Sequence, residues 1–134
     1  PPHGQKPLVL TPTLRARLAS AAQLPRGVVP ARAATIAHRW VPHGADAGNG
    51  KGYVTFASDR VWTGSDGCNA AGGHYTLGEL GEWLTTSGPS TLIGCKTTPA
   101  PTWAVRARRL GLDSSGALLL YDGRARLLGR LYRS

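Results

Sequence analysis

The segment from Gly64 to Asn69 contains the residues of this 134-residue chain that come closest to an active-site pattern. Its cysteine, Cys68, has a serine, an aspartate and an asparagine within three positions, and the only other cysteine of the chain is Cys95. Two cysteines can form a disulfide, ligate a metal or supply a thiolate nucleophile, and each role points to a different compartment and class of protein. The residue types alone leave all three roles open.

Catalysis by Cys68 would need a base, and His74 is the nearest histidine in the sequence. Catalytic triads are assembled across a fold and not along one turn, so this proximity is weak support for a thiol-dependent enzyme. The C-x5-H spacing and the lack of a second Cys-x2-Cys pair also make a metal site a poor match. We therefore expect no catalytic residue, no metal and no cofactor.

The same segment has a structural use. Asp66 and Asn69 can bond backbone amides within a turn, while Gly64 and Gly67 can take backbone angles that other residues avoid. These four residues predict a structural turn.

Aromatic residues offer a second candidate site. Trp40, Trp62, Trp83 and Tyr53 all fall in segments that we expect to be strands, where packing in the core is the default use of a large ring. If two or more of them shared an exposed face, they could line a ligand groove.

The formal charge of +9 comes from 13 arginines and only 3 lysines. A polyanion-binding surface is one interpretation of this charge. Codon usage in a high-GC genome together with solubility is the other, and we favour it because the arginines are scattered, with local groups only at 106–109 and 124–126. We expect weak polyanion binding at most and no specific nucleic acid partner.

The elements that must position these residues follow from capping and periodicity. Residues 1–34 are expected to be an arm, a short helix begun by Thr11 and Pro12, and a linker packing on the domain. From residue 35 the period of two predicts strands. The expected strands are 36–41, 53–56, 60–63, 74–77 and 81–86, with a mobile loop at 43–52. A helix with Trp103, Ala107 and Leu110 on one face, stopped by Gly111, precedes a closing hairpin of 117–121 and 125–132 around an Asp122-Gly123 turn.

This pattern predicts an α+β, mainly β domain over residues 35–134. We expect a small antiparallel barrel or a strongly curved sheet, with one helix inserted before the closing hairpin. No stretch approaches the roughly 18 apolar residues of a transmembrane segment.

The order of these segments resembles the META-domain family, also called HslJ-like. The residues that carry the resemblance are Tyr53-Val54-Thr55-Phe56, Gly64 to Asn69 with Gly73-His74-Tyr75, Thr91 to Cys95, the helix, and the strand from Leu118 to Asp122. The resemblance implies a compact β-rich fold in an exported envelope protein, often a lipoprotein, with a role in stress response and without established enzymatic activity. The stretch before residue 35 and the Thr91-Leu92-Ile93-Gly94 approach to the second cysteine depart from the family pattern.

In an exported domain of this kind a Cys68–Cys95 disulfide is the preferred role of the cysteines. It would close a loop worth roughly 3.5 kcal/mol in the chain-entropy estimate. The absence of methionine and the Pro-rich opening add to the expectation of export, with an upstream segment removed.

These observations predict a non-catalytic, envelope-associated binding or stress-protective module that is extracellular or attached to the cell envelope of a bacterium. Its partner is an unknown protein or envelope ligand. Two alternatives stay open: a secreted protease inhibitor that presents the loop 42–52, and a thiol-dependent enzyme that uses Cys68.

Overall fold

The computed structural model describes residues 11–12, 24–87 and 98–134. The expected N-terminal helix lies outside the described residues except for Thr11 and Pro12, and so does Cys95.

The described chain is built mainly from short strands. In chain order the elements are β1 (Val29–Pro30), α2 (Ala33–Ile36), β2 (Arg39–Val41), the 3-10 helix η2 (Gly44–Ala47), β3 (Tyr53–Phe56), β4 (Val61–Ser65), β5 (Ala70–Leu77), β6 (Trp83–Thr85), α3 (Ala100–Arg106), β7 (Arg109–Leu112), β8 (Leu118–Tyr121) and β9 (Leu127–Arg133).

The strands form one antiparallel sheet in the order β1-β7-β8-β9-β2-β3-β4-β5-β6. The sheet is so strongly curled that strands near its two opposite edges come into contact. Glu82, just before β6, forms a bridge with Arg109 of β7, and the amide of Leu110 donates to Gly81 O at 2.8 Å. The predicted mainly β, curved-sheet fold is therefore confirmed.

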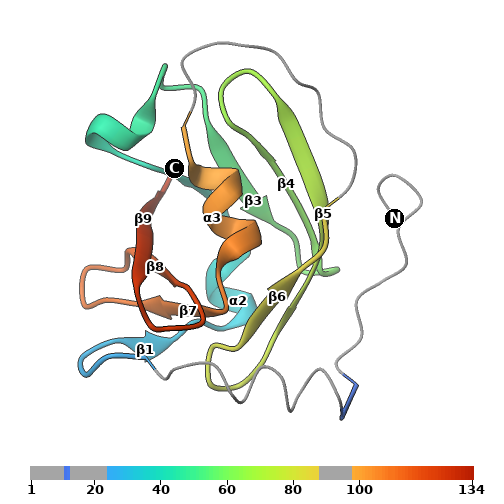
Figure 1. The fold of residues 1–134 in the computed structure, drawn as a ribbon, viewed down its shortest axis with the longest axis vertical. Helices are drawn as coiled ribbons and strands as arrows, with labels where there is room; N and C mark the ends of the chain where they lie inside the picture. The colour runs from blue at the N-terminus through green and yellow to red at the C-terminus, as the bar shows by residue number, and fades with distance from the viewer. Residues whose placement is uncertain (1–10, 13–23, 88–97) are drawn as a thin grey trace.

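Helix α3 lies in the space that the curled sheet surrounds, as Figure 1 shows. It contacts β3, β4, β6 and β9, and its buried residues include Trp103 and Ala104. Most of the remaining core consists of inward-facing strand residues, among them the fully buried Trp40, Trp62 and Trp83, and Ile36 of α2 adds to it. Burial of this apolar surface is the main stabilising contribution to the fold.

The helix before the closing hairpin is shorter than the sequence predicted. Ala107 has extended backbone angles (φ −62°, ψ 149°), and Leu110 lies in β7 rather than on the helix. The reason is long-range pairing: the amide of Arg108 donates to Tyr121 O at 2.8 Å instead of continuing the helix. The apolar spacing of Trp103, Ala107 and Leu110 fits a helix, but the residues reach the core from two different elements.

Two other predictions were inaccurate near the N-terminal side of the sheet. The segment expected to be a strand from residue 36 begins with Ile36 at the end of α2, and the strand itself starts at Arg39. Val29 and Pro30, expected to be linker, pair with β7 as β1. Both short elements depend on partners that are distant in sequence, which local periodicity does not reveal.

The turn of the closing hairpin is wider than Asp122-Gly123. The positive φ lies at Ala125 (62°), and the amide of Asp122 donates to Arg126 O at 3.0 Å. The carboxylate of Asp122 accepts the amides of Arg124 and Arg126 at 2.8 and 3.0 Å. An aspartate that caps its own turn thus replaces the expected tight Asp-Gly turn.

Candidate functional site

Asp66 organises the turn between β4 and β5. Its Oδ1 accepts the amides of Cys68 at 2.9 Å and Asn69 at 2.6 Å, and its Oδ2 accepts the side-chain amide of Asn69 at 3.0 Å. Burial raises the pKa of Asp66, but these hydrogen bonds outweigh it and hold the pKa below its usual value. The carboxylate is engaged in holding the turn.

The two glycines of this segment have different requirements. Gly67 has a positive φ of 101° and lies against Asn49, whose side chain donates to Gly67 O at 3.0 Å. Gly64 lies within β4, where a Cβ atom would stand 2.8 Å from Tyr53 O. One glycine thus serves the turn conformation and the other serves close strand packing.

His74 is poorly placed to serve as a base for Cys68. Cys68 lies in the turn before β5, whereas His74 lies four residues after the first residue of that strand. Four strand residues span about 13 Å, well beyond hydrogen-bond reach. His74 is 3% exposed.

Three of the four candidate aromatic residues are fully buried in the core. Trp40, Trp62 and Trp83 are each 0% exposed. Their indole N–H groups donate to backbone carbonyls of Ile36 (3.0 Å), Thr86 (2.9 Å) and Ala104 (2.8 Å), respectively. These side chains therefore pack the interior, which is the default use of large rings, and they do not share the exposed face that a ligand groove would need.

Tyr53, the fourth candidate, is partly exposed on β3. The guanidinium of Arg39 lies over its ring, 4.5 Å from the centroid. The ring face is therefore occupied by a neighbouring side chain of the same sheet.

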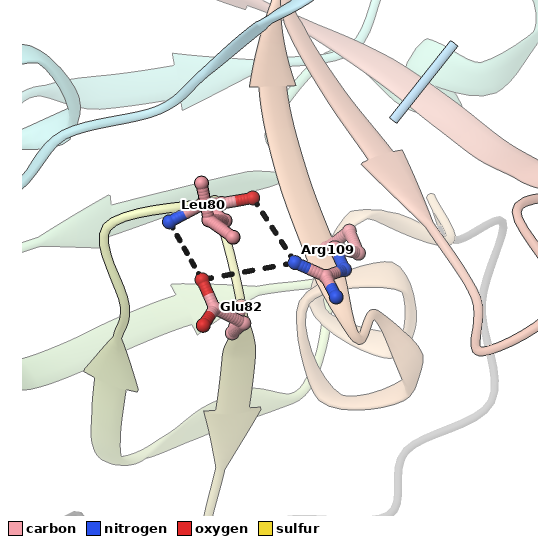
Figure 2. A network of polar contacts seen from close by, with 3 residues as sticks. All are labelled: Leu80, Glu82 and Arg109. Atoms are coloured by element: carbon pink, nitrogen blue, oxygen red, sulfur yellow. Dashed lines mark hydrogen bonds and ion pairs between the residues drawn. The ribbon is translucent and has the colours of Figure 1, made fainter. Parts of the chain in front are cut away.

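A buried ion pair lies where the sheet closes on itself. Arg109 is 3% exposed, and its Nη1 lies 3.7 Å from Glu82 Oε1 and donates to Leu80 O at 3.2 Å. Glu82 Oε1 also accepts the amide of Leu80 at 2.6 Å, so the three residues form the network in Figure 2. A neighbouring cavity of about 240 Å³ is lined by Leu24, Val28, Pro30, Leu80 and Arg109. The charge of Arg109 is balanced by Glu82. The network therefore links the segment just before β6 to β7 and leaves no unpaired charge there.

The loop proposed as a protease-inhibitor bait is compact. Residues Gly44–Ala47 form η2, and Asn49 links the loop to the β4–β5 turn through Gly67. At its start, His43 stacks on Tyr132 of β9 with centroids 4.1 Å apart. This region is a helical turn anchored at both ends rather than an extended segment.

The tertiary structure brings together two groups of arginines that are separate in sequence. Arg106 and Arg108 end α3 and lead into β7, whereas Arg124 and Arg126 belong to the β8–β9 turn. The hydrogen bond from Arg108 N to Tyr121 O places the two segments side by side. Figure 1 shows the end of α3 next to the β8–β9 turn. We call these four residues the basic end.

One carboxylate lies within the basic end, that of Asp122. The backbone hydrogen bonds from Arg126 and Arg124 hold its pKa below the usual value, and the guanidinium groups of Arg126 and Arg106 add to the effect. Sequence reasoning noted both arginine groups but did not bring them together. No local signal in the sequence could have joined them, because the segment that forms β7 was expected to belong to the helix and its pairing with β8 was not predicted.

The acidic residues are mostly committed to backbone bonds. Five of the seven accept main-chain amides in turns: Asp59, Asp66, Glu82, Asp113 and Asp122. These bonds leave the carboxylates negatively charged, and the protein is positive because its 16 arginines and lysines outnumber its 7 aspartates and glutamates.

In the described part of the chain, no group of three or more His, Cys, Asp or Glu side chains could hold a metal ion. Among those same residues, no helix has the length and apolar character needed to cross a membrane. A search for similar proteins finds no matching family model, curated protein or solved structure.

Proposed function

We propose that this protein is a non-catalytic binding or stress-protective module of the bacterial cell envelope, of META-domain type. The observation that carries the proposal is the packed interior: three of the four aromatic residues that could have lined a ligand site, Trp40, Trp62 and Trp83, are fully buried. Phe56, Tyr75 and Trp83 pack with ring centroids 4.9 to 5.9 Å apart. A partner must then be bound on the outer surface.

The side chains that could act in catalysis are committed to other contacts or lie too far apart. Asp66 is engaged in its turn, His74 lies far from Cys68 along β5, and Arg109 is paired with Glu82. Among the described residues, the exposed charged side chains without such commitments are mainly arginines, which suit an anionic partner.

Export is part of the proposal, and with it the Cys68–Cys95 disulfide. The turn that Asp66 holds would keep Cys68 in a defined position for such a bond. Intact mass measured before and after alkylation without reductant tests it. We expect no uptake of alkyl groups unless reductant is added. Uptake of two groups by the unreduced, unfolded protein would remove the disulfide and the argument for export that rests on it.

Envelope association is tested by co-sedimentation with isolated bacterial envelopes. We expect the folded protein to pellet with the envelopes, and its bound fraction to fall after prior unfolding. A folded protein that stays in the supernatant at every protein and salt concentration would overturn the proposed function.

A further inference from the structure

We propose that the basic end is a docking surface for the phosphate headgroups of anionic phospholipids. The inference rests on the proposed envelope association and names the partner at the molecular level. It is carried by the convergence of Arg106, Arg108, Arg124 and Arg126, which no local sequence feature produces.

The four arginines lie close together. Arg108 Cγ is 3.8 Å from the position that a Cβ on Gly123 would occupy, which places the Arg108 side chain beside the β8–β9 turn. Arg106 and Arg126 are both near enough to Asp122 to lower its pKa. The surface therefore carries four arginine side chains and one carboxylate, that of Asp122.

Three of these guanidinium groups are available to a partner. Arg108 is engaged, because its Nη1 donates to the carbonyls of Val105, Arg106 and Ala107 at 2.9 to 3.3 Å and so caps the end of α3. Arg106, Arg124 and Arg126 are exposed, and the described residues show no ion pair within 4.0 Å for any of them. The Asp122 carboxylate is held by backbone amides rather than by these side chains.

The shape and composition of this end favour a surface over a strand of nucleic acid. Proteins that bind single-stranded nucleic acid stack bases on exposed aromatic rings, whereas Trp40, Trp62 and Trp83 are fully buried. A hairpin turn beside a helix end presents several guanidinium groups at once to a layer of phosphates. Each arginine near an anionic membrane surface strengthens binding about five-fold, and the effects accumulate.

The test uses vesicles of phosphatidylcholine with phosphatidylglycerol, and vesicles of phosphatidylcholine alone as the uncharged reference. The variant Arg124→Gln/Arg126→Gln removes two charges whose side chains have no structural bond in the described chain, so the fold is expected to persist. The control of equal charge is Arg39→Gln/Arg133→Gln, which also removes the contacts of Arg39 with the Tyr53 ring and of Arg133 with His38. Arg133 lies seven residues along from Arg126, or about 23 Å, which exceeds the roughly 10 Å range of screened charges.

We expect the wild type to bind the anionic vesicles and not the uncharged ones. The basic-end variant should bind about 25-fold more weakly, while the control variant should lose less than about two-fold. Raising the salt concentration should weaken the wild-type binding. Far-UV circular dichroism and urea unfolding confirm that both variants keep the fold.

Three outcomes would overturn the inference: no binding to anionic vesicles, equal losses in the two variants, or tighter binding to soluble polyphosphate or duplex DNA than to the vesicles. The last outcome would assign the surface to a phosphate polymer or to nucleic acid. A wild type that pellets with isolated envelopes but ignores the vesicles would remove this inference and leave the proposed function standing. A protein that binds the anionic vesicles but not the envelopes would overturn the proposed function and leave the phospholipid-binding surface standing.

Discussion

Replacing Trp83 by phenylalanine tests how the curled sheet holds the end of α3. In a helix that continued, the carbonyl of Ala104 would accept the amide of Arg108, but that amide donates to Tyr121 O at 2.8 Å. Ala104 is 0% exposed, and its carbonyl accepts the indole N–H of Trp83 at 2.8 Å instead. The variant Trp83→Phe keeps an aromatic ring at this position and removes the donor.

The expected cost follows from two contributions. A buried carbonyl that loses its hydrogen bond costs about 1–3 kcal/mol, and the smaller ring forfeits about 1 kcal/mol of apolar burial. We therefore expect Trp83→Phe to lower the free energy of unfolding by about 3 kcal/mol. Its stacking on Tyr75, with centroids 4.9 Å apart, can be kept by the new ring.

Trp40→Phe is the matched control. Trp40 is equally buried, and its indole N–H donates to Ile36 O at 3.0 Å. That carbonyl also accepts the amide of His38 at 2.6 Å, so it stays hydrogen-bonded when the indole is removed. The expected cost is then only the lost burial, about 1 kcal/mol.

Urea unfolding followed by far-UV circular dichroism measures both variants without relying on tryptophan fluorescence. We expect Trp83→Phe to be less stable than Trp40→Phe by about 2 kcal/mol. Equal losses, within about 0.5 kcal/mol, would refute the assigned role of the Ala104 carbonyl.

Four further variants probe three separate features. Gly129→Ala should destabilise the protein by about 2 kcal/mol in urea unfolding, because the new Cβ would stand 2.4 Å from ring carbons of Trp103. Gly123→Ala is the control, because its Cβ would lie 3.8 Å from Arg108 Cγ, and it should change stability by less than about 0.5 kcal/mol. Similar losses of stability for the two glycine variants would contradict the packing argument. Asp66→Asn should cost about 1 kcal/mol at neutral pH. Because the native pKa of Asp66 is lowered, its carboxylate stabilises the fold above about pH 4 and this contribution is lost as the pH falls through the native pKa; a gap between wild type and variant that persisted in acid would speak against it. His74→Leu should leave stability unchanged or raise it by up to about 1 kcal/mol, because the buried Nδ1 has no hydrogen-bond partner in the described structure; a loss above about 2 kcal/mol would show that it has one.

Local features of the sequence predicted the elements whose partners are near in sequence. The hairpin of β3 and β4 follows from the alternation of Tyr53 to Phe56 and the short turn after it, and its register, with Phe56 opposite Trp62, needs no distant contact. The β4–β5 turn follows equally from Asp66, whose carboxylate reaches amides two and three residues ahead.

Elements with distant partners were not predictable in this way. β1 exists because Val29 and Pro30 pair with Leu112 and Gly111, and α3 ends because Arg108 pairs with Tyr121. A pattern of apolar residues shows which side chains are buried, but it cannot show which distant strand supplies the next hydrogen bond.

The sequence by itself determined the class of fold, because this depends on the period of the apolar residues. It also determined the excess of positive charge, which follows from composition alone. The tertiary structure alone decided where the aromatic rings and the arginines lie. The candidate ligand residues Trp40, Trp62 and Trp83 point into the core because the sheet curls around α3. The two arginine groups meet because antiparallel pairing of β7 with β8 returns the chain to the end of that helix. Strand pairing therefore makes the basic end, and not the aromatic residues, the candidate binding surface.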